Sequence, residues 1–186
     1  MRILRLITLT MQLSSLAVFC GSKAGSDPLF IAHAKELGHL MAERNIKLVY
    51  GGGGKGIMGA VADAVMENNG HVTGIIPEIL LEWEAHHKGI TELHVVTDMH
   101  VRKKMMYELC DAAVILAGGY GTLDELFEML TWNTLKIHTK KIFILNSNGF
   151  YNHLIEHMQK MHKDGFLYEH PEDRIVFINE PAEIFS

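Results

Sequence analysis

Two glycine-rich stretches are the part of this sequence whose residue types and spacing point most clearly to chemistry. "GGGGKGIMG" spans residues 51–59, and "AGGYGT" spans residues 117–122. Each follows a short apolar run and precedes a segment with helical spacing, so each is expected at a turn from a strand into a helix. Such a turn offers free backbone N–H groups, and glycine lets an anion approach them closely. The two stretches therefore predict a phosphate site, with plain tight turning as the alternative.

Neither standard nucleotide-binding module explains the first stretch. It matches the dinucleotide pattern G-x-G-x-x-G twice, but that pattern belongs in the first strand-to-helix turn, with an acidic residue about 20 positions further on. Here the stretch follows the second apolar run, and the next run ends at Pro77, with Glu78 directly after it. The ATP-binding P-loop needs Ser or Thr after its lysine, whereas Gly56 follows Lys55. The sequence thus argues against a dehydrogenase and against a P-loop ATPase.

The elements that must position these turns alternate along the whole chain. We predict strands at residues 16–20, 47–50, 72–76, 94–97, 112–116, 142–145 and 175–178. We predict helices at residues 28–45, 57–68, 99–109, 122–135 and 151–163. Near-continuous apolar strands such as "AAVIL" and "IFIL" are typical of a parallel sheet that is covered on both faces. The predicted fold is α/β: a single-domain, doubly wound parallel sheet, Rossmann-like, with about seven strands.

The ends and the irregular parts of the chain complete this prediction. Residues 1–12 are expected to form a loose extension, and residues 13–186 the nucleotide-binding domain. The first 20 residues superficially resemble a signal peptide, but cleavage there would remove the first strand, and Phe19 is too bulky for the processing site. Met11 is an alternative start. Residues 78–89 are the least regular segment and are expected to be a loop that closes over a site.

Composition restricts the partners and the compartment. The chain has 186 residues and a formal charge of −5 without a basic block, so nucleic acid and anionic membranes are poor partners. Its two cysteines, Cys20 and Cys110, make no disulfide framework, and a cytoplasmic location is expected. No apolar run reaches the roughly 20 residues that a membrane-spanning helix needs.

Three segments together resemble a known family. "GGGGKGIMG", "DMHVRKKMM" and "AGGYGTLDELFEMLTW" are similar to the Lonely Guy proteins, which are cytokinin riboside 5′-monophosphate phosphoribohydrolases often mislabelled as lysine decarboxylases. The family motif is P-G-G-x-G-T-x-x-E with an upstream Arg-Lys pair, and the likeness extends over nearly the whole chain from Leu16. Three positions depart from the family pattern: Ala117 replaces the proline, Asp124 stands where Glu is common, and Lys55 lies inside the first glycine stretch.

The resemblance implies a function and a set of site residues. It implies hydrolysis of the N-glycosidic bond of N6-substituted adenosine 5′-monophosphates, giving free cytokinin or adenine and ribose 5-phosphate, usually by a homodimer without metal or other cofactor. The catalytic roles fall on Arg102 and Glu125. The implied substrate and phosphate contacts are Glu84, Lys103, Gly118, Gly119, Tyr120, Gly121, Thr122, Leu123, Asp124 and Thr131. In the first glycine stretch, the expected contacts are Gly52, Gly53, Gly56 and Met58.

The chemistry explains why such residues are needed. Cleavage of a ribosyl–base bond passes through a cationic, oxocarbenium-like transition state. A carboxylate beside the anomeric carbon stabilises that cation and orients the attacking water, and Glu125 is the expected carboxylate. The alternative is a capping box over "TLDE", in which Glu125 would only bind a backbone N–H. Arg102 would hydrogen-bond the leaving base or hold the phosphate, or else be part of a solvated helix start.

Other signals carry less weight. His153 and His157 flank Glu156 in an H-x-x-E-H pattern that suits zinc, yet a solvent-facing pair on a late helix is the expected reading. Met99, Met105 and Met106 are expected beside the base. Pyridoxal phosphate chemistry needs a pocket lysine whose context we do not find here. A non-catalytic nucleotide carrier or sensor on the same fold remains the alternative function.

Overall fold

Seven parallel strands form one sheet in the computed structural model, which describes residues 13–81 and 86–186. The strands are β1 Ser15–Phe19, β2 Lys47–Tyr50, β3 Val72–Pro77, β4 Glu92–Val96, β5 Ala112–Ile115, β6 Ile142–Leu145 and β7 Ile175–Ile178. They lie in the order β4-β3-β2-β1-β5-β6-β7. The predicted parallel sheet of about seven strands is confirmed, and each predicted strand lies within two residues of an observed one. The extension expected at residues 1–12 lies outside the described residues.

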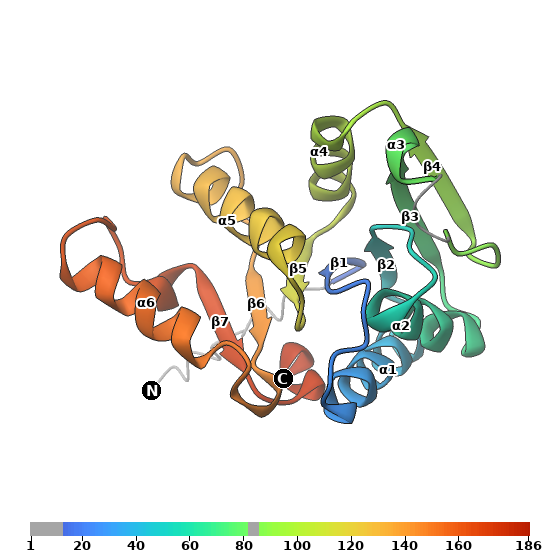
Figure 1. The fold of residues 1–186 in the computed structure, drawn as a ribbon, viewed down its shortest axis with the longest axis horizontal. Helices are drawn as coiled ribbons and strands as arrows, with labels where there is room; N and C mark the ends of the chain where they lie inside the picture. The colour runs from blue at the N-terminus through green and yellow to red at the C-terminus, as the bar shows by residue number, and fades with distance from the viewer. Residues whose placement is uncertain (1–12, 82–85) are drawn as a thin grey trace, which may run out of the picture.

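Helices cover both faces of this sheet (Figure 1). They are α1 Pro28–Glu43, α2 Gly56–Glu67, α3 Glu78–Leu81, α4 Met99–Leu109, α5 Tyr120–Thr134 and α6 Asn152–Lys163. The short 3-10 helices of the described residues are η1 Ser147–Gly149, η2 Pro171–Asp173 and η3 Pro181–Phe185. One apolar core lies between the sheet and α1 and α2, and the other between the sheet and α4, α5 and α6. The fold is therefore doubly wound, as predicted.

The central strand shows why both faces must be covered. In β1, Leu16 and Val18 point into the core with α1 and α2, whereas Ala17 and Phe19 point into the core with α4 to α6. All four side chains are at most 1% exposed. A strand whose side chains are apolar on both faces is shielded from water only when helices cover the sheet on each side.

The start of α5 differs from the prediction and removes one alternative for Glu125. The helix begins at Tyr120, with Gly119 as its N-cap, two residues before the predicted start. Thr122 consequently lies inside the first turn instead of capping the helix, so the capping-box reading of "TLDE" is wrong. The glycines caused the error, because low helix propensity suggested a loop where they in fact run directly into the helix.

The segment expected to be a loop at residues 78–89 begins with a helical turn. Glu78–Leu81 form α3 directly after β3, and an acidic residue in a first turn is favoured by the helix dipole. His86 pairs with Gly53 in an isolated bridge. In the described part of the chain, no helix is both long enough and apolar enough to cross a membrane.

The order of the strands identifies where a ligand would bind. From β1 the chain proceeds outward to β2, β3 and β4, and then crosses back to place β5 on the other side of β1. In open parallel sheets, a ligand binds beyond the carboxyl ends of the strands at such a reversal. The second glycine stretch follows β5 directly, and the first follows β2, so both lie at the expected edge.

Candidate active site

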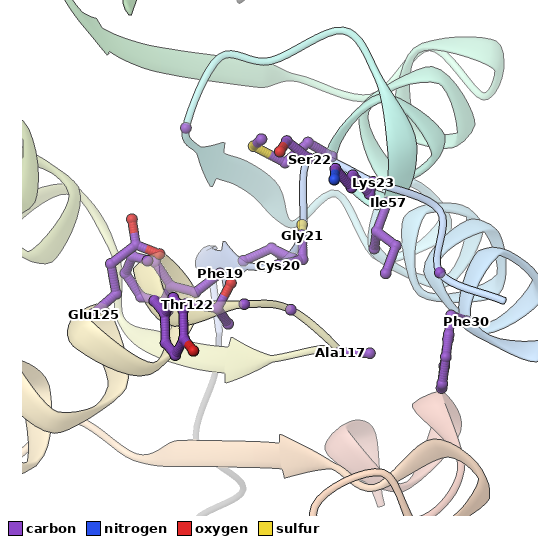
Figure 2. A pocket seen from close by; sticks show the side chains of 18 of the residues that line it. Phe19, Cys20, Gly21, Ser22, Lys23, Phe30, Ile57, Ala117, Thr122 and Glu125 are labelled. Atoms are coloured by element: carbon purple, nitrogen blue, oxygen red, sulfur yellow. The ribbon is translucent and has the colours of Figure 1, made fainter. Parts of the chain in front are cut away.

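A cavity of about 620 Å³ lies at the reversal of strand order. Residues from the ends of β1, β2 and β5 line it, together with residues of α2, α4 and α5. Figure 2 shows Glu125 and Thr122 toward one end of the cavity and Phe30 toward the other. At the Phe30 end, the ring of Phe30 meets that of Phe150 edge to face, with centroids 5.4 Å apart. The cavity thus has a charged end and an aromatic end.

Arg102 and Glu125 form an ion pair at the charged end. Nη1 of Arg102 lies 3.2 Å from Oε1 of Glu125, and both side chains are about nine-tenths buried. Arg102 comes from the first turn of α4, which Asp98 caps by accepting from the backbone N–H groups of His100 and Val101. Glu125 comes from the second turn of α5. Two residues 23 positions apart, on different helices, are therefore brought together in the cavity (125 − 102 = 23).

The backbone of the sheet holds Arg102 in this position. Its Nε donates a hydrogen bond of 3.1 Å to the carbonyl of Ile75 in β3. Gly51 leaves the space that the guanidinium needs, because a Cβ there would lie 2.2 Å from Nη2 of Arg102. The first residue of the glycine stretch thus makes room for a catalytic candidate, a role that the sequence pattern did not indicate.

Burial sets the protonation of Glu125. Desolvation raises the pKa of its carboxyl to about 7, although the Arg102 guanidinium acts in the opposite direction. A carboxyl with a pKa near 7 exchanges a proton readily at neutral pH, as a general acid or base must. Cys20 lines the same cavity, but burial raises the pKa of its thiol far above neutral, so it remains a thiol.

The turn from β5 into α5 presents backbone N–H groups to the cavity. Residues 117–122 all line it, and the N-cap Gly119 has no side chain with which to satisfy the first turn of the helix. A Cβ at Gly119 or Gly121 would meet no described atom within 4 Å. At Gly118 it would lie 2.1 Å from Oγ1 of Thr122, so this position requires glycine. The arrangement leaves the start of a 15-residue helix without a side-chain cap beside the cavity, and such a helix start favours an anion.

The first glycine stretch is used differently. Gly52 accepts a hydrogen bond from the N–H of His87, and Gly53 pairs with His86. Gly56, at φ +59°, packs against the backbone of Ser22, where a Cβ would lie 2.4 Å from the carbonyl oxygen. The N–H of Met58 donates to the carbonyl of Gly21. The turn thus contacts two neighbouring loops, and of its four predicted contacts only Met58 lines the cavity.

Several other predicted contacts stand apart from the described residues that line the cavity. Lys103 pairs with Asp124 at 3.1 Å and contacts Glu128, between α4 and α5. The hydroxyl of Thr131 donates to the carbonyl of Phe127, and its side chain borders a different, apolar groove beside α6. Leu123 packs into the core with α4 to α6. Glu84 lies outside the described residues.

The turn after β1 contributes residues that sequence reasoning missed. Gly21, Ser22 and Lys23 line the cavity, and the N–H of Gly21 donates to the carbonyl of Ala117 in the opposite loop. The available signal was the position of this turn, because it follows the central strand at the sheet's reversal. Of the three methionines expected beside a base, Met99 and Met106 line the cavity, whereas Met105 packs into the core.

The histidine pattern on α6 lies away from this cavity. The side chains of His153 and Glu156 are 99% and 70% exposed, and they pair with each other at 3.4 Å. Among the described residues, no group of three or more histidine, cysteine or acidic side chains is placed to hold a metal ion.

Sequence comparison finds relatives that share most of this chain. Residues 58–186 match the protein family described as "Possible lysine decarboxylase". A cytokinin riboside 5′-monophosphate phosphoribohydrolase of Arabidopsis thaliana is 43% identical over 166 residues, which cover 89% of this chain and 76% of that protein. Another, from Rhodococcoides fascians, is 41% identical over 163 residues, which cover 87% of this chain and 82% of that protein.

Comparison with solved structures supports the fold. The molybdenum cofactor binding protein of Rippkaea orientalis aligns with a TM-score of 0.69 at 18% identity, covering 94% of both chains. The molybdenum cofactor carrier protein of Chlamydomonas reinhardtii aligns with the same score at 16% identity, covering 92% of both. At such low identity, the likeness concerns the arrangement of strands and helices alone.

Proposed function

Because this chain belongs to the Lonely Guy family of phosphoribohydrolases, we propose that its cavity binds and hydrolyses a nucleoside 5′-monophosphate. The chain is an N-glycosidic hydrolase of cytokinin nucleotides, which releases the free base and ribose 5-phosphate. The observation that carries the assignment of the site is the buried Arg102–Glu125 pair beside an open helix N-terminus.

The substrate's phosphate binds at the start of α5 in this proposal. Gly118 to Thr122 line the cavity, no side chain caps the helix start, and the helix dipole favours an anion there. Glu125 lies five residues after Tyr120, about 7.5 Å along the helix axis at 1.5 Å per residue. That span is comparable to the distance from a 5′-phosphate to the anomeric carbon. One helix therefore aligns both ends of the ribose phosphate.

Glu125 and Arg102 then act on the glycosidic bond. As the bond between the anomeric carbon and the base nitrogen breaks, the carboxylate of Glu125 stabilises the sugar cation. Water attacks the anomeric carbon and gives a proton to Glu125 as the bond to the base nitrogen breaks. Glu125 then passes this proton through solvent to the departing base and is a carboxylate again. Arg102 remains protonated, so it acts through charge and hydrogen bonding. We place the base against Met58, Met99 and Met106, which form an apolar wall of the cavity.

The assembly and location of the protein follow as further proposals. Val101 and Leu109 of α4 are each more than two-fifths exposed, and the half-buried Met105 lies between them at the same helical spacing. An exposed apolar stripe of this kind is typical of a helix that packs against a partner, which supports a homodimer. A sedimentation measurement that gives the mass of a single chain would contradict the homodimer. Two free buried thiols and the acidic net charge support a cytoplasmic protein that binds neither nucleic acid nor membrane.

A panel of substrates tests the proposed function. We expect free base from AMP and from N6-substituted AMP, with kcat/KM at least about 100-fold above that for the matching nucleosides. Two lost charge-assisted hydrogen bonds of about 1.5 kcal/mol each account for that factor. Chromatographic measurement of the released base decides the matter. Equal cleavage of nucleotides and nucleosides would contradict the proposed phosphate site. Binding of nucleotide without release of base would favour a carrier.

A further inference from the structure

Lys103 lies in a charged cluster between α4 and α5. Its ammonium is 3.1 Å from Oδ2 of Asp124 and also contacts the carboxylate of Glu128, while its side chain is only 10% exposed. The hydroxyl of Tyr107, one turn further along α4, lies 3.2 Å from the carbonyl of Glu125 and 3.4 Å from Oε2 of Glu128. We call Lys103, Tyr107, Asp124 and Glu128 the seam cluster, since they join the two helices that carry Arg102 and Glu125.

The neighbouring residues Arg102 and Lys103 serve different sides of α4. Consecutive side chains on a helix diverge by about 100°, so Arg102 and Lys103 leave α4 toward different sides. Arg102 lines the cavity and pairs with Glu125. Lys103 has two carboxylate partners, and these lie immediately before Glu125 and one turn after it on α5. Its ammonium is therefore already engaged without a substrate.

We propose that Lys103 is a positioning residue, which holds α5 against α4 and offsets the charges of Asp124 and Glu128 so that Glu125 faces Arg102 as a carboxylate. This inference rests on the proposed function of the Arg102–Glu125 pair, and it differs from a role for Lys103 as a direct substrate ligand. Arg102 then acts at the bond that breaks, whereas Lys103 acts between α4 and α5, on the residues that hold Glu125.

The surrounding charges explain why Glu125 depends on Lys103. The groups that face its carboxyl are Cys20 after β1, Arg102, Lys103 and Tyr107 on α4, and Asp124 and Glu128 on α5. Asp124 and Glu128 raise the pKa of Glu125, whereas Arg102 and Lys103 lower it. Burial lowers the pKa of Lys103, but its hydrogen bonds to Glu128 and Asp124 outweigh burial and keep it charged. Removing Lys103 would leave two uncompensated acids beside Glu125.

Substitution Lys103→Met keeps the side-chain length and removes the charge. In the nucleotide-free protein, we expect the pKa of Glu125 to rise by about 1 unit, which is typical for the loss of a nearby opposite charge. NMR titration of labelled glutamate carboxyls measures it, with Glu125→Gln to assign the signal. With AMP at pH 7, kcat should fall about fivefold, because the carboxylate fraction of Glu125 falls from about one half to about one tenth. KM should change by less than about twofold, and the acidic limb of the pH profile should move to higher pH.

A second variant keeps the test decisive if Lys103→Met folds poorly. Lys103→Met with Glu128→Gln removes one charge of each sign, so the Glu125 titration and kcat should return toward wild-type values. If Lys103 instead binds substrate, KM would rise at least about tenfold, the Glu125 titration would stay unchanged, and the second substitution would restore nothing; that result overturns the inference. A wild-type protein that releases no base would contradict the proposed function separately, and the titration would still decide the effect of Lys103 on Glu125.

Discussion

Replacing Glu125 by glutamine is expected to reduce kcat for base release from AMP by at least about 1,000-fold, or about 4 kcal/mol of transition-state stabilisation. Glutamine keeps the shape of the side chain but cannot carry the negative charge that opposes the sugar cation. The phosphate site at the start of α5 is untouched, so the Kd for AMP should change by less than about threefold. Calorimetry and chromatographic detection of adenine measure the two quantities.

Glu108→Gln provides the matched control for this substitution. Glu108 lies on α4 with 65% of its side chain exposed, and its recorded partner is Lys104 at 3.8 Å. The Glu108→Gln variant should release adenine from AMP at the wild-type rate. If Glu125→Gln also kept that rate, the carboxylate would have no part in the reaction. If both variants and the wild type bound AMP and released nothing, the protein would be a carrier.

Substituting Arg102 by methionine is expected to lower kcat/KM for AMP at pH 7 by at least about 100-fold. Two effects combine, because the leaving base loses a cationic hydrogen-bond donor and Glu125 loses its buried counter-ion. The pKa of Glu125 is already raised to about 7 by burial, and Arg102 lowers it. The active carboxylate form exists above this pKa and is lost as pH falls through it, so the acidic limb should lie near pH 7 in the wild type and at higher pH in the variant.

Initial rates between pH 5 and pH 9 measure that limb, roughly two units on either side of the raised pKa. Lys104→Met is the matched control, because Lys104 lies two positions further along α4 with 67% of its side chain exposed. Its profile should coincide with that of the wild type. An acidic limb that stays in place in the Arg102 variant would mean that Glu125 titrates independently of Arg102, contrary to the ion pair.

The fold could be predicted because several of its strands are runs of mostly apolar residues. β1, β5 and β6 are buried on both faces, and only a covered parallel sheet accommodates such runs. The predicted helix starts were less accurate where the helix propensity of the local residues disagrees with the folded structure. The glycines before Thr122 suggested a loop, yet Tyr120 and Gly121 already belong to α5. Glu78 follows Pro77 and was assigned to a loop, but it opens the short helix α3.

The sequence motif named the pair at the centre of the candidate site but not the geometry around it. The motif indicated Arg102 and Glu125, which the structure brings to 3.2 Å. It could not show the direction of Lys103, since that depends on the rotation of α4 about its axis. Nor could it show that the N–H of Met58 donates to the carbonyl of Gly21. That contact joins two loops that meet only in the folded chain.

A crystal structure of Glu125→Gln soaked with AMP tests the central claim most directly, because this variant should bind the nucleotide without cleaving it. We expect the phosphate on the N–H groups at the start of α5 and the anomeric carbon within about 4 Å of the residue 125 side chain, close to the separation of reacting groups. A phosphate bound elsewhere, or a ribose far from residue 125, would contradict the account.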